Sequence, residues 1–316
     1  MKLSVIICTY NPRKDYLDRV LKALQMQTLD KQLCELVIVD NKSDTELIDL
    51  YDLSWHPHGR IVREEQPGLA HARIRGVQET TGEIIVFVDD DNVLQADYLE
   101  QAMQIMQERP HLGSIGGKAI PEYEVQPPVW FKDFGLIGCR DLGDTSLFTT
   151  YYEDQTTHKV NIENYPSCAP IGTGQVIHRT AFLAYRAEVS ASRERTALGR
   201  TGKKLISGED NDIVLTVLRK GWDVGYFPEL YVTHLIPARR VKASYLAKLN
   251  QAMFRSWVYV LQTHDVNPWP PIPAWSVWPR KIKSYITQQA WKGKVNYIKW
   301  RGTCGMYEGL AEIYQK

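Results

Sequence analysis

The stretch Ile-Ile-Val-Phe-Val-Asp-Asp-Asp-Asn, residues 84–92, decides the fold of this 316-residue chain. Its first five residues are apolar and mostly β-branched, which predicts a strand buried on both faces. Three consecutive aspartates and an asparagine then end the strand. Carboxylates that converge in a half-buried place repel one another unless a proton or a cation lies between them. The stretch therefore predicts a binding site as well as a strand.

Similar strands alternate with helical patterns through the first 120 residues. Apolar runs cover residues 3–8 and 36–39, a shorter one covers 61–62, and helical periodicity covers 15–28 and 69–80. Such alternation implies right-handed crossovers. It predicts an α/β fold with a Rossmann-like, mainly parallel central sheet flanked by helices.

Composition and charge exclude several classes of protein. The formal net charge is +1, so no global field favours nucleic acid as a partner. The five cysteines are scattered and never form a C-x-x-C pair, which favours a reducing, cytoplasmic compartment without zinc or disulfides. The apolar run that follows Lys2 is too short for a signal peptide. No segment approaches the roughly 18 apolar residues of a membrane span.

Polar residues follow three of the predicted strands: Thr9-Tyr10-Asn11, Asp40-Asn41 and Asp89-Asp90-Asp91. Ligands of open parallel sheets bind beyond the carboxyl ends of the strands, so all three groups should face one crevice.

The three aspartates predict a metal site in that crevice. Side chains alternate along an extended chain, so Asp89 and Asp91 should point one way and Asp90 the other. Hard oxygen ligands at a partly open site suit Mg²⁺ or Mn²⁺ shared with substrate phosphates. The alternative is a solvated turn before the next helix. Asp97, which has capping-box spacing to Glu100, is expected to cap that helix itself.

Neither G-x-G-x-x-G nor the P-loop pattern occurs, so a bound diphosphate would need a metal and cationic side chains. Arg73 and Arg75 could supply the cations, or they could form a solvated helix face. Glu209 and Asp210 stand at the predicted start of a helix that closes at Lys220-Gly221. They could cap this helix or act as a catalytic base.

Five ordered motifs between about residues 3 and 235 resemble those of the family 2 glycosyltransferases of GT-A fold. They are Ser4-Val-Ile-Ile-Cys-Thr-Tyr-Asn11, Val37-Ile-Val-Asp-Asn-Lys-Ser-Asp44, Ala72-Arg-Ile-Arg-Gly76, Gly82-Glu-Ile-Ile-Val-Phe-Val-Asp-Asp-Asp-Asn92 and Gly208-Glu-Asp210. The resemblance implies a nucleotide-sugar donor, Mn²⁺ or Mg²⁺ as cofactor, and inversion at the anomeric carbon.

The resemblance also implies a role for each matching residue. Donor binding falls to Thr9, Tyr10, Asn11, Asp40, Arg73, Asp89, Asp90 and the Gly116-Gly117 segment, of which Gly117 is the candidate residue. Metal binding falls to Asp91, with Asp89 close by, and to His234, which by itself could equally be structural. Asp210 takes the position of the general base, with Glu209 beside it.

Two departures narrow the expected activity. The usual Ala-Arg-Asn-x-Gly reads Ala-Arg-Ile-Arg-Gly, so Asn is missing at position 74. Gln251-Ala-Met-Phe-Arg-Ser-Trp257 only approximates the Q-x-x-R-W of processive synthases. We therefore expect a non-processive enzyme that transfers a sugar, with UDP as the likeliest carrier by family frequency, to a hydroxyl of a glycan or lipid-linked acceptor. Bacterial surface polysaccharide or glycolipid synthesis is the expected setting.

The expected organisation has three parts: a nucleotide-sugar-binding half (1–120), an acceptor-binding and catalytic half (121–238) and a helical extension (239–316). The extension holds six of the nine tryptophans, and residues 280–301 contain seven Lys/Arg and no Asp/Glu. Peripheral membrane contact through residues 269–301 is one interpretation, and packing of the tryptophans onto the domain is the other. Two other functions are a sugar-nucleotide nucleotidyltransferase and an inactive nucleotide-sugar-binding protein.

Overall fold

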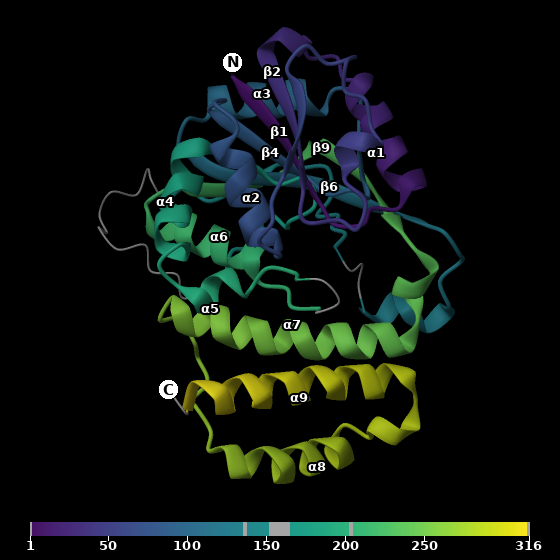
Figure 1. Cartoon of the computed structure of the whole chain (residues 1–316). Coiled ribbons are helices and arrows are strands. Elements are labelled where there is room, and N and C mark those ends of the chain that lie inside the picture. Colours follow the sequence, from purple (N-terminus) through teal and green to yellow (C-terminus); the bar gives the residue numbers. More distant parts are fainter. Residues whose placement is uncertain (1, 135–137, 152–164, 202–204, 315–316) are drawn as a thin grey trace.

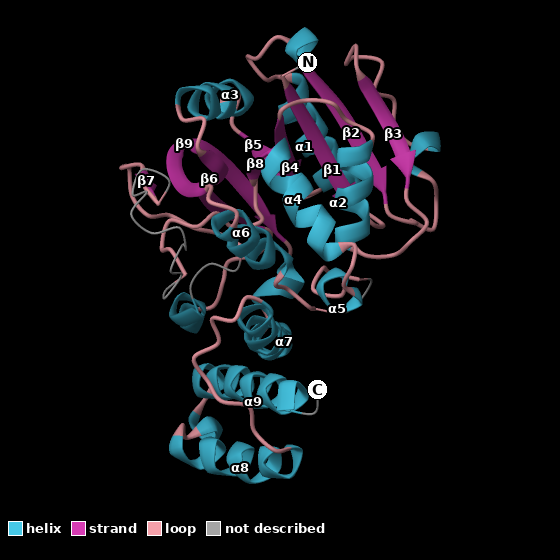
Figure 2. Cartoon of the chain, turned by 90° about the vertical axis from the view of Figure 1, so that its left-hand side faces the viewer, coloured by secondary structure: helices cyan, strands magenta, loops and turns pink. Residues whose placement is uncertain are grey.

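The computed structural model describes residues 2–134, 138–151, 165–201 and 205–314. Four strands pair in parallel in the order β3-β2-β1-β4 and form the first half of one sheet (Figures 1 and 2). They are β1 (Leu3–Thr9), β2 (Cys34–Asp40), β3 (Gly59–Arg63) and β4 (Ile84–Val88). All residues of β1, β2 and β4 are buried, as their continuous apolar runs predicted.

The second half of the sheet mixes strand directions. β8 pairs antiparallel with β4 and β6, β6 pairs parallel with β9, and β5 and β7 pair antiparallel with β9. These strands are β5 (Asn92–Leu94), β6 (Leu112–Tyr123), β7 (Leu147–Phe148), β8 (Val176–His178) and β9 (Asp223–Ile236). The α/β class is confirmed, while the continuous parallel pairing ends at β4, because β8 runs antiparallel to both of its neighbours and parallel pairing resumes only between β6 and β9.

Alternate residues of β1 face two helical layers, one on each side of the sheet (Figure 2). Val5 and Ile7 belong to a buried cluster with α1 and α3, whereas Ile6 and Cys8 belong to a second cluster with α2, α4 and α6. The helices of the two layers are α1 (Lys14–Gln25), α3 (Tyr98–Glu108), α2 (Leu69–Gln78), α4 (Arg179–Val189) and α6 (Glu209–Arg219). This layering leaves the carboxyl ends of the strands open at one edge.

Helix α3 begins directly after Asp97, but the predicted capping box does not form. Among the described residues, the Asp97 side chain makes no cap hydrogen bond, and its Oδ1 is buried without a hydrogen-bond partner. Gln27, just after α1, caps the helix instead, because its Oε1 accepts from the Leu99 N–H at 3.0 Å. The capping prediction is therefore wrong for Asp97, since a residue distant in sequence satisfies the helix terminus.

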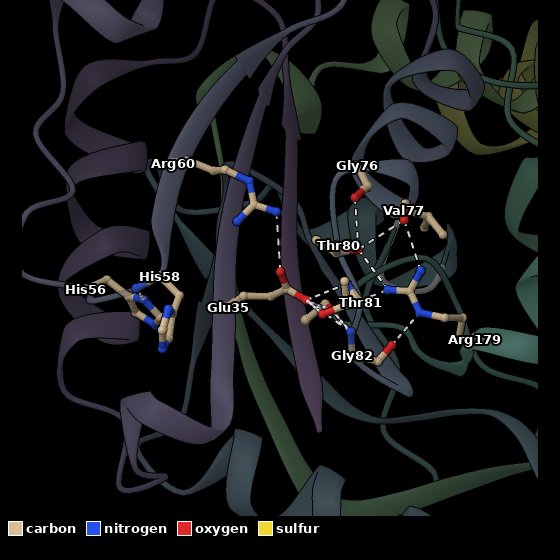
Figure 3. Close-up of polar contacts among 11 residues, drawn as sticks. Glu35, His56, His58, Arg60, Gly76, Val77, Thr80, Thr81, Gly82 and Arg179 are labelled. Atoms are coloured by element: carbon tan, nitrogen blue, oxygen red, sulfur yellow. Dashed lines mark hydrogen bonds and ion pairs between the residues drawn. The ribbon is translucent and has the colours of Figure 1, made fainter. Parts of the chain in front are cut away.

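A buried carboxylate, Glu35, ties the strands together at their amino ends, and Figure 3 shows its polar contacts. Glu35 on β2 accepts hydrogen bonds from the Ser4 hydroxyl at 2.9 Å and from the N–H groups of Thr81 and Gly82 at 2.6 and 3.0 Å. Arg60 lies 3.3 Å from its other oxygen. Burial alone would raise the pKa of Glu35, but these donors outweigh burial and lower it. The cluster fixes β2 against β1 and β4.

The C-terminal extension is helical, as predicted. In Figure 1, α7 (Ala243–Thr263) lies against the sheet domain, α9 (Lys294–Tyr314) lies on α7, and α8 (Val277–Thr287) lies beyond α9. Glycines allow the close approach of α7 and α9: a Cβ on Gly305 would overlap the Gln251 carbonyl oxygen. Among the described helices, none is long and apolar enough to cross a membrane.

Short helical segments complete the fold. They are α5 (Arg193–Thr196) and the 3-10 helices η1 (Lys31–Leu33), η2 (Leu47–Asp49), η3 (Val129–Phe134), η4 (Ala238–Val241), η5 (Ala274–Ser276) and η6 (Ala290–Lys292).

Candidate active site

A cavity of about 1040 Å³ opens at the carboxyl ends of β1 and β4 and reaches across to α7. Most of the predicted site residues line it. They are Thr9, Tyr10, Arg73, Asp89, Asp90, Asp91, Glu209, Asp210 and His234. The fold thus brings the acidic stretch after β4 together with the acidic pair at the start of α6.

Asp91 is the aspartate with the most cationic surroundings. Its Oδ2 lies 3.1 Å from Arg240 Nη2 and 3.4 Å from His234 Nε2, and its Oδ1 accepts from Asn92 Nδ2 at 3.0 Å. Strand pairing explains this position, because Asn92 on β5 stands opposite His234 on β9. Burial would raise the pKa of Asp91, but His234 and Arg240 hold it well below its usual range. Asp91 is therefore a carboxylate.

Positive charge offsets the burial of Asp89 and Asp90 less than it offsets the burial of Asp91. Asp90 accepts a short hydrogen bond from the Thr9 hydroxyl, yet burial and the charge of Asp91 raise the pKa of Asp90 to about 7. Burial and Asp91 likewise raise the pKa of Asp89. Simultaneous ionisation of all three adjacent carboxyl groups is therefore unfavourable without added positive charge.

His234 faces Asp91 with one ring nitrogen and the backbone with the other. Its Nδ1 lies 2.8 Å from the Gly138 carbonyl oxygen, to which it donates. Burial would lower the pKa of His234, but the Asp91 carboxylate raises it to about 10. Arg240 Nη1 also lies 3.0 Å from Nε2.

These residues fit a divalent cation that the protein ligates only in part. Two aspartates are short of positive charge, and carboxylate oxygens are the ligands that Mg²⁺ and Mn²⁺ prefer. Within the described residues no group of three or more His, Cys, Asp and Glu side chains forms a closed metal site. The fit is therefore to an open site, completed by ligand oxygens or water.

The two acidic residues at the start of α6, Glu209 and Asp210, lie in different surroundings. Glu209 points inward and forms a buried ion pair with Arg73, whose Nη1 lies 3.3 Å from Oε1. Burial raises the pKa of Glu209, and Arg73 offsets this only in part. Asp210 is less buried, lines the cavity, and accepts from the Gly172 N–H at 3.2 Å. Asp210 is therefore the carboxylate that a bound molecule can reach.

Three predicted donor-binding residues lie outside the cavity lining. Asp40 is buried, and its carboxylate accepts from the Ser43 N–H at 2.8 Å and from Arg63 Nη1 at 2.9 Å, which shapes the loop after β2. Asn11 bonds Ser43 through its N–H and Asp44 through its side chain. Gly117 lies against β9, where a Cβ would overlap the Leu230 carbonyl oxygen. Asp40 and Asn11 thus act on the cavity through Ser43 and Asp44, which line it.

The sequence analysis did not predict most of the cationic side chains that line the cavity, nor the apolar side chains of α7 that form one of its walls. Arg75 pairs with Glu79 at 2.7 Å, outside the cavity lining. Cations that line the cavity include Lys42, Arg63, Arg200 and Arg240, and α7 contributes Leu249, Met253, Phe254 and Trp257. The spacing 249, 253 and 257 marks one face of α7, which is a signal that the sequence did contain.

A model of the family described as Glycosyl transferase family 2 matches residues 4–185. The glucosyl-dolichyl phosphate glucuronosyltransferase of Haloferax volcanii is 22% identical over 309 residues, 95% of this chain and 82% of that protein. The poly(ribitol-phosphate) beta-N-acetylglucosaminyltransferase TarS of Staphylococcus aureus is 25% identical over 162 residues. That match covers 48% of this chain and only 28% of TarS.

Two solved structures share the fold. GalNAc-T7, solved with UDP, GalNAc and Mn²⁺, has a TM-score of 0.57 at 16% identity over 99% of this chain and 56% of that chain. A fragment of S. aureus TarS in complex with UDP-GlcNAc has a TM-score of 0.52 at 14% identity over 100% of this chain and 92% of the fragment. Since the family model covers more than half of the sequence and both structures share its architecture, the chain belongs to the family 2 glycosyltransferases and has the GT-A fold.

Proposed function

We propose that this glycosyltransferase moves a sugar from a nucleoside-diphosphate sugar, with UDP as the first candidate carrier, to a hydroxyl of a lipid-linked glycan. Each encounter transfers one sugar with inversion at the anomeric carbon, in the synthesis of a surface polysaccharide or glycolipid. The observation that carries the proposal is the shared cavity, which holds three aspartates, several cations and the accessible carboxylate of Asp210.

Asp210 acts as the general base. It accepts the proton of the acceptor hydroxyl while that oxygen attacks the anomeric carbon and the bond from this carbon to the diphosphate oxygen breaks. The electron pair of the broken bond leaves with the diphosphate. Arg73 lies on the same cavity wall and favours that negative charge, and Glu209 is a positioning residue that holds Arg73. A single base without a covalent intermediate is consistent with inversion.

Asp91, Asp89 and His234 are the proposed holders of Mn²⁺ or Mg²⁺. When bound, the ion supplies positive charge that stabilises the departing diphosphate. Thr9, Tyr10 and Asp90 contact the nucleoside in this proposal, and Asn11 and Asp40 support the loop beside it. Gly172, which lines the cavity next to Asp210, takes the place at the donor sugar that the sequence suggested for Gly117.

The apolar wall of α7 supports a lipid-linked acceptor. Met253 and Phe254 are exposed, and Trp257 packs edge-to-face on Tyr165 at 5.3 Å between ring centroids. Such a wall suits the hydrocarbon beside a glycosyl phosphate, and the relative that aligns over 95% of the chain is named for a dolichyl phosphate acceptor. We also infer a cytoplasmic protein that meets this acceptor peripherally at a membrane through residues 269–301. All five cysteines are free, in keeping with that compartment.

The family assignment leaves no support for the nucleotidyltransferase alternative. An inactive binding protein remains the competing reading, and one experiment separates the two. A panel of nucleotide sugars is screened for Mn²⁺-dependent thermal stabilisation, and the best ligand is then incubated with polyprenyl-phosphate-linked sugars. We expect one donor to raise the melting temperature and to release its nucleoside diphosphate, with a product of inverted anomeric configuration by NMR. Stabilisation without any turnover would favour the binding protein.

A further inference from the structure

Helix α8 has an inner face that packs on α9. Val277 and Ser284 are buried there, Lys281 pairs with Glu308 at 2.6 Å, and Gln288 Nε2 donates to the Thr303 hydroxyl at 2.9 Å. Residues 277, 281, 284 and 288 follow helical spacing, so this face accounts for one side of the helix. The opposite side of α8 points away from the rest of the molecule (Figure 1).

That outer side is apolar and exposed, the reverse of an ordinary surface helix. Trp278, Ile282 and Ile286 stand one turn apart and are 72%, 59% and 58% exposed. Trp275, just before α8, is 78% exposed. A row of large apolar side chains at helical spacing on the solvent side marks an interaction surface, whereas single exposed apolar residues do not.

Aromatic packing extends this row towards the next turn of the chain. Tyr285 lies 5.8 Å from the Trp291 ring and 5.0 Å from the Trp300 ring, measured between centroids. Trp291 is also exposed. The apolar surface therefore continues from α8 onto η6.

The charged residues in the sequence around this surface are all basic. Residues 266–307 contain seven Lys/Arg and no Asp/Glu. Lys281 is neutralised by Glu308 of α9, whereas Arg280, Lys283, Lys292 and Lys294 are exposed. Tryptophans that border apolar and basic side chains are typical of helices that lie in the headgroup region of a bilayer.

We propose that the α8 face docks on the surface of an anionic lipid bilayer, with the apolar row in the headgroup boundary and the basic residues on lipid phosphates. The α8 face is made up of Trp275, Trp278, Ile282, Lys283, Ile286, Trp291, Lys292 and Lys294. This inference extends the proposed function. It rests on that function only for the reason why the protein would bind a membrane, since a lipid-linked acceptor lies in a bilayer. Docking itself requires no donor or acceptor.

The charge pattern decides against a second copy of the chain as the partner. A symmetric contact through the α8 face would set one basic cluster against another, and like charges across an interface are unfavourable. An anionic bilayer provides both the apolar boundary and the opposite charge.

The test is co-sedimentation of the full chain with vesicles of phosphatidylcholine, with or without phosphatidylglycerol. We expect binding only to the anionic vesicles, weakened by salt. Lys283→Gln with Lys292→Gln should weaken binding about twenty-five-fold, at about fivefold for each charge. Trp278→Ala with Ile282→Ser and Ile286→Ser should weaken it by more than about tenfold. Because these side chains are exposed, circular dichroism and the melting temperature should be unchanged.

Matched variants serve as controls. Ile48→Ser with Leu50→Ser and Val129→Ser changes three side chains of similar exposure elsewhere, and Lys2→Gln with Lys22→Gln removes two exposed charges. Both controls should bind vesicles as the unchanged chain does. Absence of binding to anionic vesicles, or equal losses in the control and α8 variants, would overturn the proposal. So would a dimer that the α8 variants convert to a monomer. Because the assay contains no nucleotide sugar, failure of the proposed transfer reaction would leave its result unaffected.

Discussion

Asp91, Asp90 and Asp89 share one backbone turn but differ in their electrostatics. Asp91 has Arg240 and His234 within 3.4 Å and stays ionised. Asp90 has only the Thr9 hydroxyl as a close partner, and the pKa of Asp90 rises to about 7. The turn thus carries one fixed charge and one proton that a cation can displace.

This proton gives a pH dependence for metal binding. A Mn²⁺ ion beside Asp91 disfavours this proton, and His234 can ligate the ion only after its ring loses a proton of its own. The pKa of His234 is raised to about 10, so both groups release protons on binding, and the affinity for Mn²⁺ should rise by at least about tenfold between about pH 6 and about pH 8. Titration calorimetry measures the effect, and Asp90→Asn should make the slope smaller. An affinity that stays flat with pH in the unchanged chain would contradict the assigned pKa shift.

Single residues were predicted well where their position follows from the end of a strand. The aspartates after β4 and Thr9 after β1 reach the cavity because parallel strands end at one edge. Asp40 follows the same rule, but the next loop captures its carboxylate through the Ser43 N–H. Arg240 was missed because nothing local distinguishes it from Arg239, and only the course of η4 brings it to Asp91.

At the scale of elements, short strands position the site more than long ones do. β5 has three residues, yet its pairing with β9 sets His234 beside Asp91. A run as short as Asn92–Leu94 carries no periodic signal, and neither does β8. For this reason the sequence predicted the first four strands and the long helices, but neither β5 nor β8.

The contact between α7 and α9 yields a stability prediction. The methyl group of Gly305→Ala would overlap the Gln251 carbonyl oxygen. This oxygen belongs to the backbone of α7, which cannot move aside as a flexible side chain can. We expect the free energy of unfolding in urea to fall by about 2 kcal/mol. That loss exceeds the gain of up to about 1 kcal/mol in helix propensity.

Gly293→Ala is the matched control, because a Cβ there meets open space. It should change the free energy of unfolding by less than about 1 kcal/mol. If both substitutions lowered the free energy of unfolding equally, the loss in Gly305→Ala would not come from the close packing of α7 against α9, and the prediction would be wrong.

At the scale of the whole molecule, the cavity is built from two unequal parts. The family model ends at residue 185, whereas Asp210, His234, Arg240 and the α7 wall all come from the later chain. The part of the chain that the family model covers supplies Thr9, Tyr10, Arg73 and the three aspartates, and the later chain completes the cavity. The apolar wall was not predicted because it arises only from the packing of α7 against the domain.

Asp210 and Glu209 have different proposed roles at the start of one helix. Both line the cavity, but Asp210 is the more exposed of the two, whereas Glu209 is buried against Arg73. Loss of the base should stop the chemistry and leave the donor site intact, while loss of the buried partner should disturb donor binding as well.

The transfer rate and the donor affinity of Asp210→Asn, measured on one preparation, test the central claim most directly. Asp49→Asn, an exposed aspartate outside the cavity lining, is the control. We predict that Asp210→Asn lowers transfer by at least about a hundredfold, as expected for a general base, while nucleotide-sugar binding stays within about twofold. Transfer by Asp210→Asn at a rate close to that of the Asp49→Asn control would contradict the account.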